Sequence, residues 1–336
     1  MTPSPPGCPA CASSTPLDFV ENHFDHYGGR SYRLFRCRVC AVVSTEPRTA
    51  VGADWYVKAT PLRDRESRPP PESDWRFQQF LSDRLTPGRL LDVGCGDGGF
   101  LRLAAGHGFA PIGFDYDARV VAQAKARGLD ACAMEFSDFI AGCKPGEFDF
   151  VTMFDVLEHT PEPAWFFGQV KRLIRPGGHV VITLPNALRP LPWGREEHDF
   201  PPHHFTRWTP DAMKDFLERE GFEVIRQEAG ALKLRYLCDH FFFYRLMPNV
   251  LALARRVLFG KPAEGTGATL TELYDRAGGA KAGMLGDKMR RQKIINAARC
   301  SFQCLFAPVG LCLKTYYCSR EPRSGDCLFT LARRKV

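Results

Sequence analysis

The chain has 336 residues, long enough for one full domain with additions, and 44% of them are hydrophobic. No uninterrupted apolar run approaches the ~20 residues needed to span a bilayer, which argues against a membrane-spanning protein. The formal net charge of +7 arises beyond residue 230, because the first 230 residues carry 26 Lys and Arg against 31 Asp and Glu. The first residues lack the apolar stretch of a signal peptide, so we expect a cytoplasmic protein, with peripheral contact at the inner membrane face left open.

Four of the thirteen cysteines form two Cys-x-x-Cys pairs, Cys8 with Cys11 and Cys37 with Cys40. Two such pairs can supply the four thiolates of a tetrahedral zinc site, whereas a redox motif would be a single pair beside a βαβ unit. We therefore expect residues 1–57 to form a zinc-ribbon-like domain. Its zinc would be structural, because four cysteines leave no coordination position open.

A charged, proline-rich stretch at residues 58–73 is typical of a linker. Apolar residues with helical spacing follow from Trp75 to Leu85. An apolar run from Arg89 to Val93 then predicts a buried strand that leads into a glycine-rich turn.

The turn after this strand has glycines at positions 94, 96 and 98, which let the backbone approach a ligand closely. It also matches the G-x-G-x-x-G dinucleotide pattern, but that pattern alone is weak evidence. Two acidic residues distinguish between the possible cofactors. Asp92 precedes the turn and Asp97 lies inside it, and carboxylates would repel a pyrophosphate. They suit the ammonium and sulfonium groups of S-adenosylmethionine, so we expect a methyl donor rather than a nicotinamide cofactor.

Strands and helices alternate along the rest of this region. Expected strands cover residues 111–115, 131–134, 148–154, 179–184 and 222–225, and expected helices cover 117–127, 163–174 and 209–221. We expect the residues from Arg175 to Gly178 to form a turn that neither helix nor strand crosses. The alternation predicts an α/β fold, a Rossmann-like doubly wound sheet over residues 74–230. Ligands bind such sheets at the carboxyl ends of the strands.

The sequence from about Asp74 to Ile225 resembles the class I S-adenosylmethionine-dependent methyltransferases, closest to the group that includes quinone, sugar and natural-product O-methyltransferases. The matching runs are Leu-Asp-Val-Gly-Cys-Gly, Gly-Phe-Asp, Phe-Asp-Phe-Val-Thr-Met-Phe-Asp-Val-Leu-Glu-His and Leu-Ile-Arg-Pro-Gly-Gly. These runs are specific for fold and cofactor and carry little information about the substrate. Similar cysteine pairs precede the methyltransferase domain in several families of this group, which strengthens the expectation of zinc.

The resemblance implies where the cofactor binds. Asp92, Gly94 and Gly96 would line its methionine part and Asp115 would take its ribose. Glu135 would lie beside the adenine and Phe154 beside the methionine end. The full expected cofactor-binding set is Asp92, Gly94, Cys95, Gly96, Asp115, Tyr116, Glu135, Phe154 and Asp155.

His203 and His204 are the expected catalytic bases, in a loop from His198 to Trp208 that is dense in aromatic and titratable groups. In this fold the loop after the fifth strand overhangs the transferable methyl group. Methyl transfer is an in-line displacement in which the protein mainly aligns and deprotonates the nucleophile, and neutral histidine suits the second task. One of two adjacent histidines often merely packs or caps, and that reading stays open.

The run from Asp155 to His159 is a second candidate cluster. In some quinone O-methyltransferases that it resembles, an acid-x-x-Glu-His stretch holds a divalent metal near the substrate oxygens. Here the first acid is aspartate, one methylene shorter. Three roles therefore stay open: a metal site, direct base catalysis by His159, and orientation of the loop by Glu158 and His159.

The end of the chain departs from the usual arrangement of this fold. Residues 322–336 predict the final, antiparallel strand, but residues 231–321 precede it as a basic helical insertion. From residue 231 onward there are 19 Lys and Arg against 7 Asp and Glu, a net charge of +12. An anionic membrane face, a lipid-linked or phosphorylated substrate, or nucleic acid would fit this charge. The alternative is a helical cap or dimer contact whose basic residues are simply exposed to solvent. The cysteines at 300, 304, 312, 318 and 327 are irregularly spaced and are expected to be buried thiols.

Together these features predict a methyltransferase that acts on a hydroxyl of a small-molecule, glycan or lipid-linked acceptor. The alternative is a ribose-directed RNA methyltransferase that uses the zinc ribbon and the basic C-terminal region for binding. The Asn-Pro-Pro-aromatic motif of amino-directed nucleic-acid enzymes is absent, which counts against base N-methylation only.

Overall fold

The computed structural model describes residues 7–26, 28–49, 70–192, 196, 199–246, 249 and 285–336. The chain divides into two compact units, the first made of Met1–Arg189, Glu197–Gly230 and Gly325–Val336 and the second of Pro190–Glu196 and Ala231–Ser324. Most of the expected linker, His198 and much of the expected insertion lie outside the described residues. Within the described part of the chain, no helix combines the length and apolar character needed to cross a membrane.

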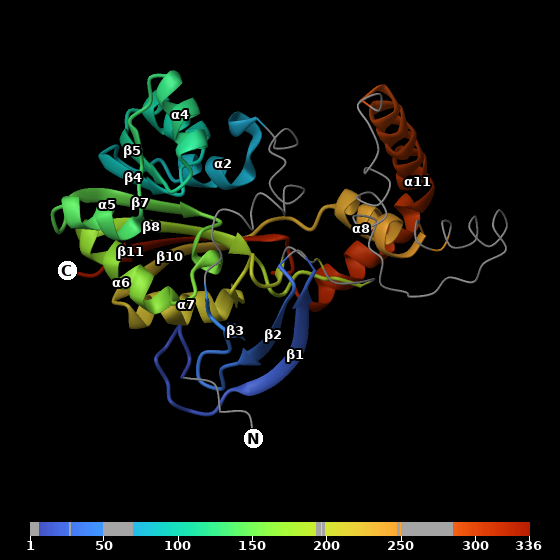
Figure 1. Cartoon of the computed structure of the whole chain (residues 1–336), viewed down its shortest axis with the longest axis horizontal. Coiled ribbons are helices and arrows are strands. Elements are labelled where there is room, and N and C mark those ends of the chain that lie inside the picture. The colour runs from blue at the N-terminus through green and yellow to red at the C-terminus, as the bar shows by residue number, and fades with distance from the viewer. Residues whose placement is uncertain are drawn as a thin grey trace. The chain divides into compact units, whose positions relative to one another are not determined.

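A seven-stranded sheet forms the centre of the first unit (Figure 1). Its strands are β4 (Arg89–Val93), β5 (Ala110–Asp115), β6 (Ala131–Ala133), β7 (Phe148–Phe154), β8 (Ile174–Pro185), β10 (Phe222–Ala229) and β11 (Cys327–Arg334). Their order is β10-β11-β8-β7-β4-β5-β6. The strands from β6 to β8 are parallel, and β11 runs antiparallel between β8 and β10. This confirms the predicted Rossmann-like α/β fold and its antiparallel last strand.

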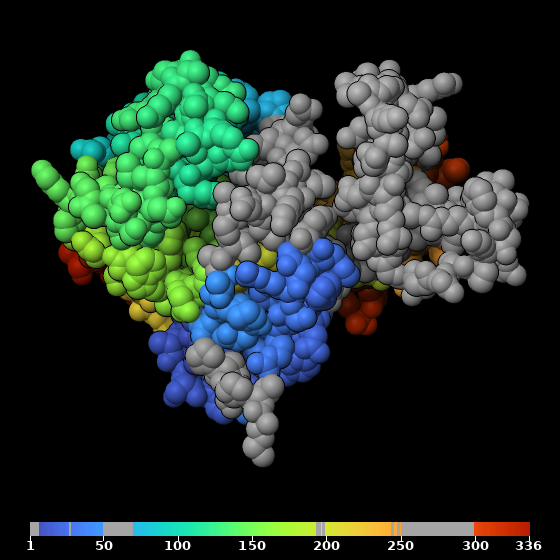
Figure 2. Space-filling view, viewed as in Figure 1, coloured from blue at the N-terminus to red at the C-terminus, as the bar shows by residue number. Residues whose placement is uncertain are grey.

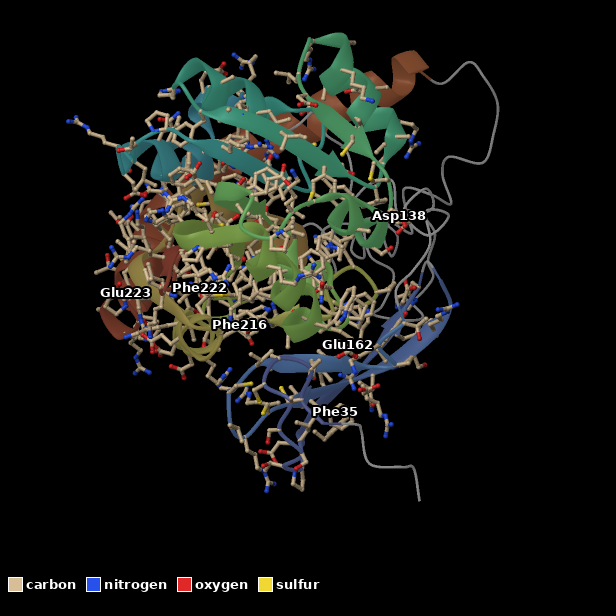
Figure 3. All side chains as sticks on the ribbon, turned by 90° about the vertical axis from the view of Figure 1, so that its left-hand side faces the viewer. Phe35, Asp138, Glu162, Phe216, Phe222 and Glu223 are labelled. Atoms are coloured by element: carbon tan, nitrogen blue, oxygen red, sulfur yellow. The ribbon has the colours of Figure 1, made fainter. Side chains whose placement is uncertain are left out.

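Helices cover both faces of this sheet because its strands are apolar on both sides. The helices are α2 (Trp75–Ser82), α3 (Gly99–Gly106), α4 (Ala118–Ala126), α5 (Phe136–Gly142), α6 (Pro163–Leu173) and α7 (Pro210–Arg219), with short 3-10 turns η3 (Pro71–Ser73) and η4 (Leu157–His159). Leu90 packs in one cluster with α2 and α3, whereas Leu91 packs in another with α5, α6 and α7. In the second cluster the ring of Phe167 lies 5.2 Å from Phe216 and 5.3 Å from Phe222. Figure 3 labels Phe216 and Phe222.

The strand β8 begins earlier than the sequence indicates. The expected turn from Arg175 to Gly178 is wrong, because these residues continue the strand from Ile174. They form an irregularity against β7, where Ile174 pairs with Phe148 and His179 with Phe150. Gly177 has a φ of +75°, so the glycine that would end a helix here permits a bulge instead.

The N-terminal residues form a second, four-stranded sheet in the same unit. It contains β1 (Asp18–Asp25), β2 (Arg30–Arg36), β3 (Val43–Glu46) and β9 (Thr206–Arg207), in that order. Its fourth strand, β9, comes from a part of the chain about 160 residues beyond β3. In Figure 2 the blue N-terminal segment lies directly against the green and yellow core. A β-ladder between β3 and β9 therefore joins the N-terminal segment to the core.

The second unit contains the described part of the insertion. Its helices are α8 (Leu234–Phe241), the π-helical turn η6 (Phe242–Leu246) and α11 (Leu285–Arg320). Phe241 of α8 stacks on Phe302 and Phe306 of α11, at 5.6 Å and 4.6 Å between ring centroids. Elsewhere on α11, Leu305 is 82% exposed and Val309 51%.

Most of the irregularly spaced cysteines are not buried. Cys300, Cys304 and Cys312 are exposed, and Cys318 and Cys327 are half-buried. The expectation of buried thiols is therefore wrong for the first three. They lie on α11 outside the side that packs on α8, and an amino-acid spacing says nothing about which side of a long helix finds a partner.

Candidate functional site

A glycine turn connects β4 to α3 at the carboxyl end of the sheet. Gly94, Gly96 and Gly98 have φ values of +76°, +57° and +81°, which side-chain-bearing residues rarely adopt. The backbone N–H of Gly94 donates to the carbonyl of Phe114 in β5 at 2.7 Å. A Cβ on Gly94 would lie 2.8 Å from Val156, so this position is closed to larger residues. The turn is thus held tightly against β5 and the loop after β7.

Two buried carboxylates flank this turn. Asp92 accepts a hydrogen bond from the hydroxyl of Thr152 at 2.7 Å, and burial raises its pKa to about 7. Asp115 ends β5 and accepts hydrogen bonds from the backbone N–H groups of Gly96 and Asp117, both at 2.9 Å. Asp115 therefore fixes the turn and stands at the strand end where the ribose is expected.

The other expected cofactor residues have different surroundings. Cys95 is buried, Tyr116 is 52% exposed, and Glu135 stands at the N-cap of α5. The ring of Phe154 packs 4.9 Å from Phe77 and 4.6 Å from Phe100, so it belongs to the aromatic cluster beneath α2 and α3. The structure places all of these residues at or near the strand ends, and their contacts to a cofactor stay a prediction.

Asp155, the last of the expected set, lies in a charged cluster. Its φ is +57°, and it accepts a hydrogen bond from Thr183 of β8 at 3.1 Å. It also forms a close ion pair with Arg76 of α2, which binds Asp74 at 2.6 Å as well. Sequence reasoning missed Arg76, because an arginine inside an amphipathic helix usually reaches solvent.

Three histidines meet beside the end of β7. The ring centroids of His159, His203 and His204 lie 4.5 Å to 4.7 Å apart, although more than forty residues separate His159 from the other two in the sequence. His159 Nδ1 lies 2.7 Å from the carbonyl oxygen of His203. Burial and then His204 lower the pKa of His159 to about 3, so this imidazole is neutral at pH 7. The structure therefore brings together all three expected catalytic residues.

A buried ion pair supports the loop that carries two of these histidines. Arg189 and Asp199 form a close pair with exposed side-chain fractions of 7% and 10%. Asp199 Oδ1 also lies 3.6 Å from Nδ1 of His204. Neither residue was identified from the sequence, because no local pattern links position 189 to position 199.

The acid-x-x-Glu-His stretch does not assemble as a ligand set. Among the described residues, metal-ligating groups of three or more gather only as the three histidines and as the four N-terminal cysteines. Asp155 is engaged by Arg76 instead. Glu158 is 1% exposed, and burial raises its pKa well above the ordinary value, with Asp155 adding to the shift. Neither carboxyl oxygen of Glu158 has a hydrogen-bond partner in the described structure.

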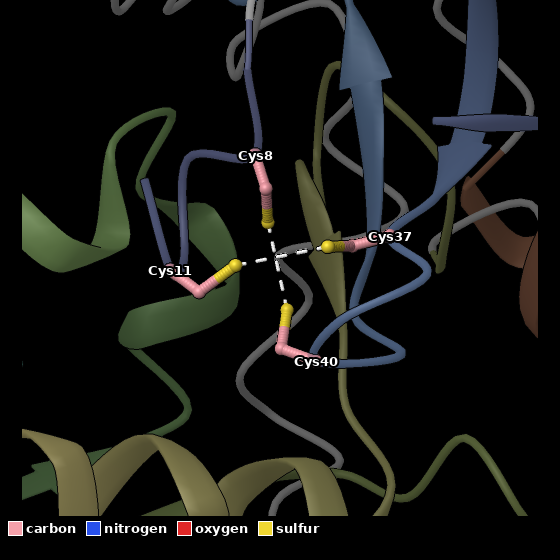
Figure 4. Close-up of side chains that lie close together, drawn as sticks. All are labelled: Cys8, Cys11, Cys37 and Cys40. Atoms are coloured by element: carbon pink, nitrogen blue, oxygen red, sulfur yellow. Dashed lines mark hydrogen bonds between the residues drawn. The ribbon is translucent and has the colours of Figure 1, made fainter. Parts of the chain in front are cut away.

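The four N-terminal cysteines form the other cluster (Figure 4). The sulfurs of Cys8 and Cys40 lie 3.5 Å apart and those of Cys11 and Cys37 3.7 Å apart. Four thiolates around one zinc at 2.3 Å would lie about 3.8 Å apart, so the arrangement fits a tetrahedral ion. A hydrogen bond from Cys40 lowers the pKa of Cys8 to about 5, and the same contact raises the pKa of Cys40.

A cavity of about 740 Å³ opens on the N-terminal sheet. It is lined by Asn22, His23, Phe24, Ser31, Tyr32, Arg33, Glu46 and Pro47. The ring of His23 lies 4.9 Å from that of Phe200, whose carbonyl accepts hydrogen bonds from the N–H groups of His203 and His204, both at 3.1 Å. One wall of the cavity thus packs against the loop that carries the histidines.

Comparisons with known proteins identify the family of this chain. Residues 70–227 match the family model of a methyltransferase domain. A ubiquinone biosynthesis O-methyltransferase from Methylococcus capsulatus is 31% identical over 171 residues, which cover 44% of this chain and 71% of that protein. The chain belongs to the class I S-adenosylmethionine-dependent methyltransferases. A ubiquinone biosynthesis O-methyltransferase from Acinetobacter baylyi is 27% identical to this methyltransferase over 222 residues, which cover 60% of the chain and 88% of the relative.

Among solved structures, a SAM dependent methyltransferase from Archaeoglobus fulgidus aligns with this methyltransferase at a TM-score of 0.49 and 15% identity. The alignment covers 82% of this chain and 99% of that one.

Proposed function

We propose that this methyltransferase transfers a methyl group to a hydroxyl oxygen of a small-molecule, glycan or lipid-linked acceptor. The observation that carries the proposal is the cluster of His159, His203 and His204 beside the end of β7. Methyl transfer to oxygen needs the hydroxyl proton to be removed, and imidazoles that are neutral near pH 7 suit that task. Both ubiquinone-pathway relatives are named as O-methyltransferases, which supports oxygen as the accepting atom.

Different residues of this chain would bind the methyl donor and activate the acceptor. S-adenosylmethionine, when bound, supplies an electrophilic methyl group on a sulfonium. Asp115 and the glycine turn would hold its ribose and methionine parts, as the family resemblance implies. Asp92 would face its ammonium group. The histidine cluster then aligns and deprotonates the acceptor hydroxyl, and His203, which is less buried than His204, is the more accessible of the loop pair.

The acceptor would approach from the side of the N-terminal sheet. The cavity there lies within the ~300–1,000 Å³ range of small-molecule sites, and its wall packs on the histidine loop through His23 and Phe200. Asn22, Ser31 and Glu46 offer the lining polar groups that could bind hydroxyls. In this reading the N-terminal sheet contributes to acceptor binding.

The four-cysteine cluster would hold one structural zinc ion. Its sulfur separations support the assignment, and four protein ligands leave no position for substrate. The ion would stabilise the N-terminal sheet and, through β9, the histidine loop.

Labelling of fractionated extracts tests the function. The full-length protein is incubated with methyl-labelled S-adenosylmethionine and aqueous small-molecule, lipid, glycan and RNA fractions. The Asp115→Ala variant serves as the inactive control. We expect label in the small-molecule, lipid or glycan fraction, as an ether that survives mild base. Label confined to RNA, or label bound to nitrogen or carbon, would contradict the proposal.

A further inference from the structure

We propose that His159, His203 and His204 bind one divalent transition-metal ion, typified by Zn²⁺, at a site distinct from the four-cysteine cluster. The site deepens the proposed function, because its ion would act on the acceptor oxygen. Metal binding itself does not depend on that function.

The ligand atoms are already gathered. One nitrogen from each of the three imidazoles lies within 4.8 Å of the others. Zinc–nitrogen bonds of 2.0–2.1 Å place the nitrogens of a tetrahedral site about 3.4 Å apart, so small side-chain rotations would close the set. The two loops that contribute them are tied together, since the N–H of Phe205 donates to the carbonyl of Glu158 at 2.8 Å. The backbone therefore holds the cluster in place before any ion binds.

A neighbouring carbonyl orients the imidazole of His159 as a metal ligand, and a carboxyl group lies near that of His204. A carbonyl oxygen can only accept a hydrogen bond, so His159 must carry its proton on Nδ1, which faces the carbonyl of His203 at 2.7 Å. This tautomer leaves the lone pair of His159 on Nε2. Asp199 lies 3.6 Å from Nδ1 of His204 and is anchored by Arg189. Ligand histidines usually have such a carbonyl or carboxylate behind them, which fixes the ring and raises its basicity.

Acidic side chains beside the cluster also suit a cation. Glu158 precedes His159 in the chain and is 1% exposed, and its carboxyl oxygens have no hydrogen-bond partner in the described structure. Burying a carboxyl group without a partner is costly. A divalent ion held by the three imidazoles would introduce positive charge into this pocket of acids, which also includes Asp199.

The donor set selects the kind of ion. Imidazole nitrogens suit Zn²⁺, Co²⁺ and Ni²⁺, whereas Mg²⁺ prefers oxygen ligands. Three protein ligands leave a coordination position open, in contrast to the four-cysteine cluster. An acceptor oxygen in that position would lose its proton more readily, because a bound metal lowers the pKa of an oxygen ligand.

Metal analysis of the full-length protein tests the site. Reduced protein is dialysed against micromolar Zn²⁺ and then against metal-free buffer, and zinc is measured per chain. We expect two equivalents in the wild type and one in the His159→Ala/His204→Ala double variant. His107→Ala is the matched control, because the ring of this exposed histidine contacts the carbonyl of Leu103 in its own helix, and it should keep two equivalents. One equivalent in the wild type, or two in the double variant, would overturn the proposal.

A second measurement covers the case in which the double variant fails to fold. Wild-type protein whose cysteine cluster is already filled with Zn²⁺ is titrated with Co²⁺. We expect one equivalent to give visible ligand-field bands without a thiolate charge-transfer band, as nitrogen ligands require. Absence of these bands, or a thiolate band with the first equivalent, would also overturn the site. Methyl transfer is not needed for either readout, so loss of the site and failure of the proposed function are told apart.

Discussion

Ser44 pairs with Thr206 in an antiparallel ladder that joins the N-terminal sheet to the residues just beyond His204. The same neighbourhood is joined a second time, since the N–H of Ala164 in α6 donates to the carbonyl of Pro9 at 3.2 Å. Cys8, Cys37 and Cys40 belong to the same buried apolar cluster as Trp208, and Cys11 packs against it. The four cysteines and the histidine loop are therefore parts of one structure.

This coupling predicts the effect of breaking the cysteine cluster. Cys40→Ser should remove the zinc and lower the free energy of unfolding by more than about 3 kcal/mol, because loss of a metal is among the strongest destabilising changes. Calorimetry should show the whole first unit unfolding earlier, and methyl transfer should fall as well. The control is Cys300→Ser, at an exposed position on α11, which should change neither. A separate early transition that leaves the main one unshifted would contradict the coupling.

Asp115 is predicted to anchor the ribose. Asp115→Ala removes two hydrogen bonds to a charged acceptor, each worth roughly 1.5–3 kcal/mol, so affinity for S-adenosylmethionine should fall by about 100-fold or more. Because Asp115 also accepts from Gly96 and Asp117, Asp115→Asn serves as a milder variant that keeps one acceptor oxygen. Isothermal calorimetry checks both, with Asp130→Asn as the exposed control. Unchanged affinity in the alanine variant would refute the assignment.

Asp92 should make stability depend on pH. Burial raises its pKa from 3.8 to about 7, so its contribution is fully present below pH 3.8 and is lost as the pH rises through 7. Asp92→Asn does not titrate. The free energy of unfolding of the cofactor-free wild type should therefore decline against this variant between pH 4 and 7, by up to about 4 kcal/mol, and then level off. Urea unfolding at several pH values measures the difference, and a difference that stays constant with pH would contradict the burial of a protonated Asp92.

Membrane contact by residues 231–321, one of the alternatives that the sequence leaves open, also has a direct test. Leu305, Val309 and Tyr316 recur at helical spacing on α11 and are all exposed, in a region with 19 Lys and Arg against 7 Asp and Glu. The protein should sediment with vesicles that contain anionic lipid and release them in high salt. Leu305→Glu with Val309→Glu should weaken this binding, whereas Ser301→Glu on the same helix should weaken it less. Equal binding to neutral vesicles would argue against the charge-driven contact.

Much of the fold was predictable because its signals are local. Apolar runs and turn residues in the sequence predict the glycine turn after Val93 and the strand β11, and the structure has both. The β8 bulge was missed because Pro176 and two glycines indicate a turn, while their pairing with β7 depends on a partner strand elsewhere in the chain.

The sequence predicted which residues belong to the candidate site but not how they are arranged. His159, His203 and His204 were each identified, but their meeting depends on two loops packing together, which no sequence spacing shows. The partnership of Arg76 with Asp155 and the ladder between β3 and β9 are long-range in the same way. Local patterns thus identified the candidate groups, and tertiary packing decides which of them meet.

The central claim, methyl transfer at the histidine cluster, is tested most directly by turnover of histidine variants. His203→Ala, His204→Ala and the double variant are assayed with the labelled acceptor fraction, and donor binding is measured separately by calorimetry. Groups that remove a proton from a hydroxyl, or make that hydroxyl more acidic, typically raise the reaction rate by 10²–10⁴-fold. The rate of methyl transfer should therefore fall by at least about 10²-fold, while the affinity for the methyl donor stays normal. Near-normal turnover in all three variants would contradict the account and would place the chemistry away from this cluster.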